Sequence, residues 1–129
     1  MKTMMMLRDD FYFVTESGKN SSFAFYHIRL NPGHFIFAAH FPGDPVTPGV
    51  CLIQMGRELV EDFIGRQLSL KMLKNVKFLS VVSPVETPEF RFHIAKLTYN
   101  ENGDEISVMM NAEADGKPLL KMSFVATVR

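Results

Sequence analysis

The stretch from Pro48 to Ile64 constrains the fold most, because its apolar residues recur at the spacing of an α-helix. Thr47 is the predicted N-cap, Pro48 suits the first helical position, and Gly65 suits a C-terminal stop. The first half of the segment is almost entirely apolar, so other elements must surround it. We expect one long central helix, about 25 Å from end to end at roughly 1.5 Å per residue.

Segments with strand character lie on both sides of this helix. Alternating or β-branched and aromatic residues occupy positions 11–14, 23–30, 70–82, 91–99, 107–114 and 120–128. Turn-forming residues separate them at Glu16–Ser22, Asn100–Asp104 and Asp115–Gly116. The pattern predicts an α+β chain, a single domain over residues 1–129, with an antiparallel sheet of about five or six strands. Phe35–Ala39 is a short apolar stretch that leads into a proline-rich loop.

The composition argues against several classes of protein. The chain of 129 residues carries 14 basic and 14 acidic side chains, so its formal charge does not favour nucleic acid as a partner. The single Cys51 cannot form an internal disulfide and has no cysteine partner for a zinc site, which fits a reducing compartment. The N-terminal methionine run is too short for a signal-peptide core or a membrane span. We expect a cytoplasmic protein without metal.

One helix cannot cover a long sheet alone. Phe23, Phe25 and the aromatic residues of 90–99 are expected to leave apolar surface exposed. We therefore expect a homodimer, or a higher oligomer of dimers, that covers this surface or joins two sheets.

The loop before the helix reads HFPGDPVTPGV, from His40 to Val50. It resembles the signature of the 3-hydroxyacyl-[acyl carrier protein] dehydratases of fatty acid synthesis. That signature combines a His-Phe-Pro-Gly loop, a Pro-x-x-Pro-Gly helix start and an acid on the central helix. The positions that match are His40, Phe41, Pro42, Gly43, Pro45, Pro48 and Gly49. A weaker likeness covers Asn75–Val85 and Glu113–Ala126.

The resemblance implies the hotdog fold, in which a curved antiparallel β-sheet wraps around one long central helix. It implies a 3-hydroxyacyl substrate on the phosphopantetheine arm of acyl carrier protein or coenzyme A, which loses water to give a trans-2-enoyl thioester. The histidine of the signature, here His40, acts as base on the C2 hydrogen, and the helix acid protonates the departing hydroxyl. The family uses no metal or redox cofactor, and base and acid come from opposite subunits.

The chemistry suits the residues present. Removing the weakly acidic C2 proton places negative charge on the thioester oxygen, which backbone amides at a helix N-terminus stabilise. Gly49 and Val50 occupy such an end, and glycine allows close approach of substrate. The intrinsic pKa of histidine suits a base near neutral pH. We therefore predict that His40 is catalytic and that Phe41, Pro48, Gly49 and Val50 contact the substrate.

The chain departs from the family at the acid. The family's acid lies fourteen positions after the histidine, which is Gln54 here, and Glu58 follows one turn later on the same helix face. In one interpretation Glu58 replaces the acid directly or through water. In a second, His40 and the amides work alone with a weakened rate, and in a third, the chain is an impaired subunit that binds acyl thioesters or pairs with an active partner. Thioester hydrolysis on the same fold would also need Glu58.

Overall fold

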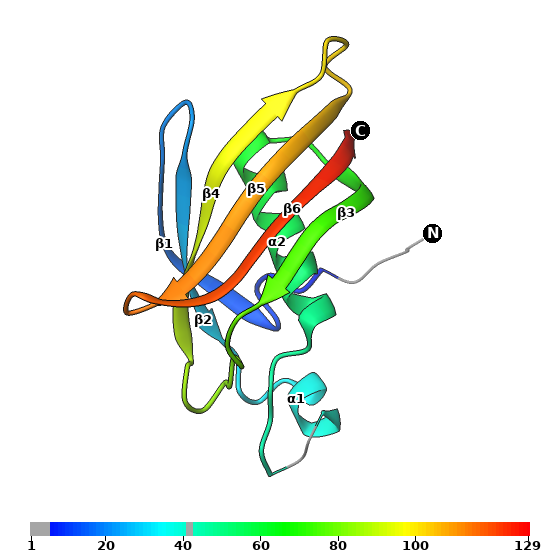
Figure 1. The fold of residues 1–129 in the computed structure, drawn as a ribbon. Helices are drawn as coiled ribbons and strands as arrows, with labels where there is room; N and C mark the ends of the chain where they lie inside the picture. The colour runs from blue at the N-terminus through cyan, green and yellow to red at the C-terminus, as the bar shows by residue number, and fades with distance from the viewer. Residues whose placement is uncertain (1–5, 41–42) are drawn as a thin grey trace.

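The computed structural model of the chain describes residues 6–40 and 43–129. In that part of the chain six strands and two helices follow one another as β1 (Tyr12–Lys19), β2 (Ala24–Leu30), α1 (Phe35–Ala39), α2 (Gly49–Ile64), β3 (Leu68–Phe78), β4 (Glu89–Tyr99), β5 (Glu105–Ala114) and β6 (Lys117–Val128) (Figure 1). The predicted central helix is α2. The structure therefore confirms the expected alternation of one long helix with flanking strands.

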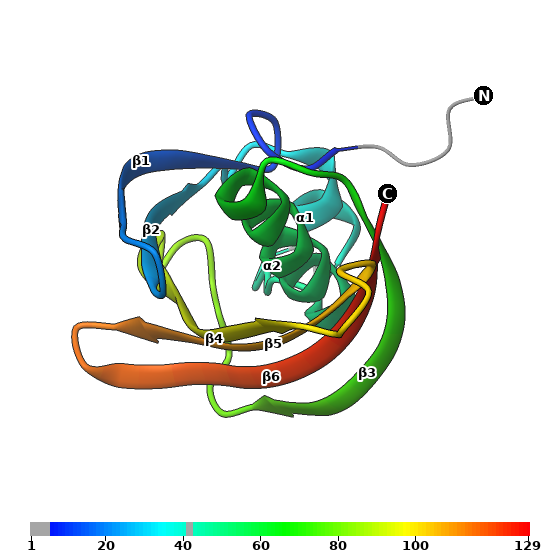
Figure 2. The same ribbon diagram turned by 90° about the horizontal axis from the view of Figure 1, so that it is seen from above.

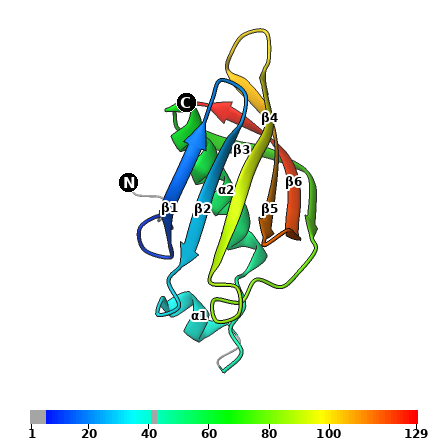
Figure 3. The same cartoon turned by 90° about the vertical axis from the view of Figure 1, so that its left-hand side faces the viewer.

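All the strands belong to one antiparallel sheet with the order β1-β2-β4-β5-β6-β3. Seen from above, the sheet curls around α2, with β1 and β3 at its two edges (Figure 2). This is the α+β hotdog arrangement. The short α1 lies beyond one end of the sheet, at the opposite end from the β4–β5 turn (Figure 3).

The core forms where the inward side chains of the sheet meet α2. From the helix, Leu52, Met55 and Leu59 are buried. A Cβ atom at Gly56 would collide with the terminal methyl of Met122, so glycine allows close approach of helix and sheet. The facing sheet residues include Tyr26, Ile28, Phe92, Ile94, Ile106, Val108, Met110 and Phe124. Their alternation with polar residues fixes which face of each strand points inward.

The start of α2 differs from the prediction. Pro48, not Thr47, is the N-cap, and no side chain caps the helix. The backbone N–H of Thr47 donates to the carbonyl oxygen of Val82 at 2.8 Å, while its buried hydroxyl has no partner among the described residues. The prediction at the other end is confirmed, because Gly65 caps the helix in the left-handed conformation with φ of 72°.

Two segment predictions also need correction. The predicted turn Glu16–Ser22 is partly strand, because β1 continues through residues 16–19, which pair with residues 24–27 of β2. β3 ends at Phe78 rather than continuing to position 82. For β1, pairing with a strand further along the chain decides the outcome. Phe35–Ala39, which the sequence marks only as a short apolar stretch, forms the helix α1.

The exposed apolar surface lies only partly where it was expected. Phe23 and Tyr99 are exposed, as expected, but Phe90 and Phe92 are buried in the core, so that expectation was wrong for them. The larger apolar exposure is on the edge strand β3, through Leu70, Met72, Leu73 and Phe78. An edge strand also has unpaired backbone hydrogen-bonding groups, so β3 is suited to pairing with another chain.

Candidate functional site

His40 lies at the end of α1. It is the C-cap residue of this helix, and its backbone N–H donates to the carbonyl oxygen of Ile36 at 3.0 Å. The residue is exposed, so its imidazole is placed at the surface of the subunit. Phe41, the predicted substrate contact that follows it, lies outside the described residues.

The first turn of α2 contains the amides predicted to stabilise negative charge. The N–H groups of Cys51 and Leu52 donate to the carbonyl oxygen of Pro48, at 3.0 and 3.2 Å. The amides of Gly49 and Val50 precede them, in the part of a helix where N–H groups have no intrahelical acceptor. Val50 is 74% exposed, which leaves this turn accessible.

The surroundings of Gly49 do not match the prediction that substrate approaches this residue closely. A Cβ atom at Gly49 would lie 2.7 Å from the ring of Phe78, which packs against this turn from the end of β3. The missing side chain therefore makes room for Phe78. A thioester that reaches the amide of Gly49 must lie beside this ring or displace it.

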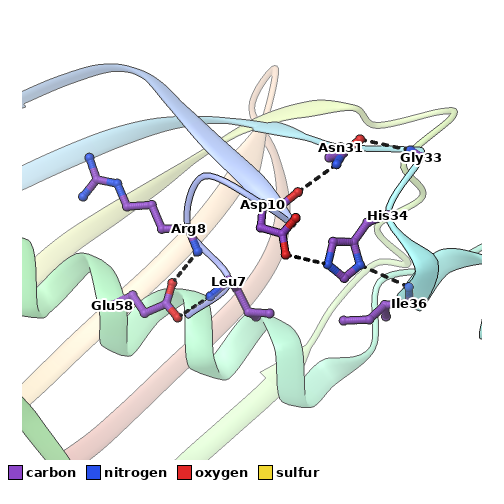
Figure 4. Close-up of polar contacts among 8 residues, drawn as sticks. All are labelled: Leu7, Arg8, Asp10, Asn31, Gly33, His34, Ile36 and Glu58. Atoms are coloured by element: carbon purple, nitrogen blue, oxygen red, sulfur yellow. Dashed lines mark hydrogen bonds and ion pairs between the residues drawn. The ribbon is translucent and has the colours of Figure 1, made fainter. Parts of the chain in front are cut away.

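The carboxylate of Glu58 is buried and surrounded by donors. The residue is 2% exposed, and its Oε2 accepts from the backbone N–H of Leu7 at 2.8 Å and from Gln54 Nε2 at 2.9 Å. Its Oε1 accepts from the N–H of Arg8 at 3.0 Å and from the hydroxyl of Tyr12 at 2.8 Å. Three of these four hydrogen bonds, from Leu7, Arg8 and Tyr12, hold Glu58 against the N-terminal part of the chain, and Figure 4 shows the two from backbone amides.

Residues that sequence reasoning missed complete this network. Burial, and then the nearby carboxylate of Glu58, raise the pKa of Tyr12 far above that of an ordinary tyrosine. Next to it, burial alone would raise the pKa of Asp62, but hydrogen bonds from Tyr26 and Arg8 lower it. The one signal in the sequence is an acid among apolar helix positions, since a buried carboxylate requires partners.

A groove of about 600 Å³ lies beside α2. It is lined by Met6, Val50, Ile53, Gln54, Arg57, Glu61, Gln67, Leu68, Ser69, Leu70 and Arg129. The groove therefore brings together two predicted site residues, Val50 and Gln54, with apolar side chains of α2 and β3. His40, Pro48, Gly49 and Glu58 are not among the residues that line it.

Other candidate groups are accounted for by their surroundings. Burial raises the pKa of the Cys51 thiol, which disfavours its reactive thiolate form. His27 contacts Glu89, and His93 contacts Glu113, both on the outer face of the sheet. Within residues 6–40 and 43–129, no three side chains of His, Cys, Asp or Glu come together as metal ligands would. No helix in that part of the chain has the length and hydropathy to cross a membrane.

Comparison with known sequences identifies relatives. The sequence profile of the ApeI-like family, described as ApeI dehydratase, matches residues 15–113, well over half of the chain. The 3-hydroxyacyl-[acyl-carrier-protein] dehydratase FabZ of Latilactobacillus sakei is 30% identical over 82 residues, covering 58% of this chain and 59% of that enzyme. The FabZ of Lactococcus lactis is 28% identical over 123 residues, covering 90% of this chain and 78% of that enzyme.

Comparison with solved structures supports the fold. The dehydratase heterocomplex ApeI:P from Xenorhabdus doucetiae matches with a TM-score of 0.67 and 17% identity, covering 88% of this chain and 96% of that one. A hypothetical thioesterase with coenzyme A from Streptococcus pneumoniae matches with a TM-score of 0.61 and 8% identity, covering 92% and 85%. At these identities the likeness shows the shared hotdog fold.

Proposed function

The chain belongs to the ApeI-like dehydratase family, and we propose that it removes water from 3-hydroxyacyl thioesters to give trans-2-enoyl thioesters. The observation that carries this proposal is the exposed first turn of α2, with the amides of Gly49 and Val50, on a chain that retains His40. Acyl carrier protein or coenzyme A would carry the substrate on its phosphopantetheine arm. The relatives named for carrier-protein substrates support the first of these carriers.

In the proposed reaction, the imidazole of His40 takes a proton from C2. The electron pair left on C2 is delocalised onto the thioester oxygen, where the amides of Gly49 and Val50 stabilise the charge. The C2–C3 double bond then forms as the C3–O bond breaks, and the hydroxyl leaves as water after gaining a proton. The proposal includes no metal or redox cofactor, since these steps need only proton transfer and charge stabilisation.

The alternatives for Gln54 and Glu58 differ in which group gives a proton to the leaving hydroxyl. The amide of Gln54 is not an acid near neutral pH, and each carboxylate oxygen of Glu58 already accepts two hydrogen bonds from protein donors. We therefore favour a working but weakened enzyme, in which water protonates the leaving hydroxyl. Loss of a general acid typically slows such a reaction by about 10²–10⁴-fold.

A second candidate is a subunit that pairs with an active dehydratase. Its support is the exposed apolar edge of β3, through Leu70, Met72 and Phe78, together with glutamine at the position of the acid. The likeness to a dehydratase heterocomplex adds to that support. In such a pair His40 would act with an acid from the partner subunit. A homodimer formed through the same edge is the arrangement expected of the first candidate.

Mass spectrometry of acyl thioesters tests the proposal. The protein is incubated with 3-hydroxyacyl chains on acyl carrier protein and on coenzyme A, and loss of water is followed for wild type and Gln54→Glu. A weakened dehydratase predicts slow water loss that Gln54→Glu accelerates. Water loss that appears only after a second dehydratase-like subunit is added supports the partner role. Release of free acid would show thioester hydrolysis instead, and no product with any carrier would contradict the proposal.

A further inference from the structure

His34 lies in the connection between β2 and α1. Its side chain is 3% exposed. Its ring meets the ring of Phe11 edge-on, with centroids 5.2 Å apart, and stacks on Phe35 at 4.6 Å. A buried imidazole requires hydrogen-bond partners, and both ring nitrogens of His34 have one (Figure 4).

The partners of His34 define what each nitrogen does. Nδ1 accepts a hydrogen bond from the backbone N–H of Ile36 at 3.1 Å, which makes His34 the N-cap of α1. Because a backbone N–H only donates, Nδ1 must be the unprotonated nitrogen of a neutral ring. Nε2 then carries the hydrogen and donates to Oδ2 of Asp10 at 3.3 Å. Asp10 and Ile36 thus hold His34 from two sides.

This cap connects directly to His40. Helix α1 has five residues, which is too short to persist without support from its ends or from packing. The peptide groups of Ile36 lie between the two histidines, since its N–H donates to His34 and its carbonyl oxygen accepts from the N–H of His40 at 3.0 Å. Two hydrogen bonds therefore separate the ring of His34 from the backbone of His40.

The other side of His34 is tied to the central helix. Asp10 belongs to the same N-terminal segment as Leu7 and Arg8, whose backbone N–H groups donate to Glu58 of α2. Asn31 fixes this segment further, since its Nδ2 donates to the carbonyl oxygen of Asp10 at 2.8 Å. The path from α2 through Asp10 to α1 is visible in Figure 4. It couples the placement of α1 to the helix that carries Gln54.

We propose that His34, held by Asp10, is a positioning residue that sets the place of the His40 imidazole through the cap of α1. The inference rests on the proposed function only for its kinetic consequence, since the placement of His40 is measurable without turnover. His34 itself touches no reacting atom in this account. Its two contacts select one tautomer and one orientation, and α1 transmits that orientation to His40.

The test compares His34→Ala, which removes the cap, with His34→Asn, which restores an oxygen acceptor of a preferred N-cap residue. Asp10→Ala removes the carboxylate that accepts the hydrogen bond from Nε2 of His34. His27→Asn is the matched control, because His27 pairs with Glu89 on the outer face of the sheet. Two readouts are taken: the imidazole resonances of His40 in histidine-labelled protein, identified by their loss in His40→Ala, and the separate values of kcat and KM for dehydration.

We expect His34→Ala to shift and broaden the His40 resonances and to lower kcat about five- to tenfold, the scale of a lost N-cap, with little change in KM. His34→Asn should bring the His40 resonances back toward their wild-type positions and kcat to within about twofold of wild type. Asp10→Ala should shift the resonances less than His34→Ala does. His27→Asn should change neither the resonances nor kcat. The inference is overturned if His40 resonates as in wild type in both His34→Ala and Asp10→Ala, or if His34→Asn is no closer to wild type than His34→Ala. If His34→Ala does not fold, the same resonance shift in Asp10→Ala supports the inference and its absence overturns it. A wild type that dehydrates no thioester would refute the proposed function, while the resonances would still decide the placement of His40.

Discussion

Replacing Glu58 by glutamine tests whether this carboxylate is a structural acceptor or a proton donor. The change keeps the shape of the side chain and converts one acceptor oxygen to an NH₂ group. At Oε1 the wild-type donors are Arg8 N–H and the Tyr12 hydroxyl, and at Oε2 they are Leu7 N–H and Gln54 Nε2. Each oxygen thus serves one backbone donor, which is fixed, and one side-chain donor, which can reorient.

The magnitude follows from that division. Tyr12 and Gln54 can turn to accept from the new NH₂ group, but one of the two backbone N–H groups is left facing it. A buried donor without an acceptor costs about 1–3 kcal/mol, and hydrogen bonds to a charged group contribute about 1.5–3 kcal/mol. We therefore expect Glu58→Gln to lower the free energy of unfolding by about 2–3 kcal/mol.

Urea unfolding followed by circular dichroism measures this change at a fixed protein concentration, because association would alter the apparent stability. Glu86→Gln is the control, since Glu86 is exposed and its replacement should change the unfolding free energy by less than about 0.5 kcal/mol. Hydrogen exchange at the amides of Leu7 and Arg8 should also accelerate in Glu58→Gln. If stability and exchange stay unchanged while dehydration is abolished, Glu58 is the proton donor and the structural interpretation is wrong.

Three further predictions concern groups with defined surroundings. Gln54→Glu should raise the dehydration rate, by up to about 10²–10⁴-fold, because it restores an acid at the family's position; an unchanged rate in the mass-spectrometric assay would show that the acid is not what limits turnover. Because hydrogen bonds from Tyr26 and Arg8 lower the pKa of Asp62 in the folded protein, its stabilising contribution is present above its ordinary pKa of about 3.9 and is lost as the pH falls through the lowered value. As the pH is lowered from about 5 to about 2, the unfolding midpoint of the wild type should therefore fall more than that of Asp62→Asn. Parallel plots of midpoint against pH for the two proteins would contradict this. Burial raises the pKa of Cys51, so its alkylation by iodoacetamide near neutral pH should be slow in native protein and fast in urea, whereas equal rates would place the thiol at the surface.

The sequence was sufficient to predict the features that depend on local periodicity. The apolar spacing of 48–64 marks α2, the alternation in 107–114 and 120–128 marks the strands of a hairpin, and Gly65 marks the helix end. These patterns agree with the tertiary structure because the same faces that repeat in sequence are buried by the curled sheet. The match of His40–Gly49 with the family signature extended the prediction to the dehydratase family to which the chain belongs.

The remainder depends on partners that are distant in sequence. Three of the four hydrogen bonds of Glu58 come from about fifty positions away, at Leu7, Arg8 and Tyr12, and no local pattern connects these residues to it. For the same reason α1 could not be predicted, because five residues carry too little periodicity and its cap is a histidine fixed by Asp10. Residue preference favours Thr47 as the N-cap. In the structure the backbone N–H of Thr47 donates to the carbonyl oxygen of Val82, and the helix begins one position later than predicted.

The most direct measurement for the whole account is the rate of water loss from a 3-hydroxyacyl thioester by wild type and by His40→Ala. If His40 is the base, wild type forms the trans-2-enoyl product and His40→Ala is slower by about 10²–10⁴-fold with its fold and KM retained. Equal rates for the two proteins would show that the imidazole takes no part in the reaction and would contradict the site proposed at the start of α2.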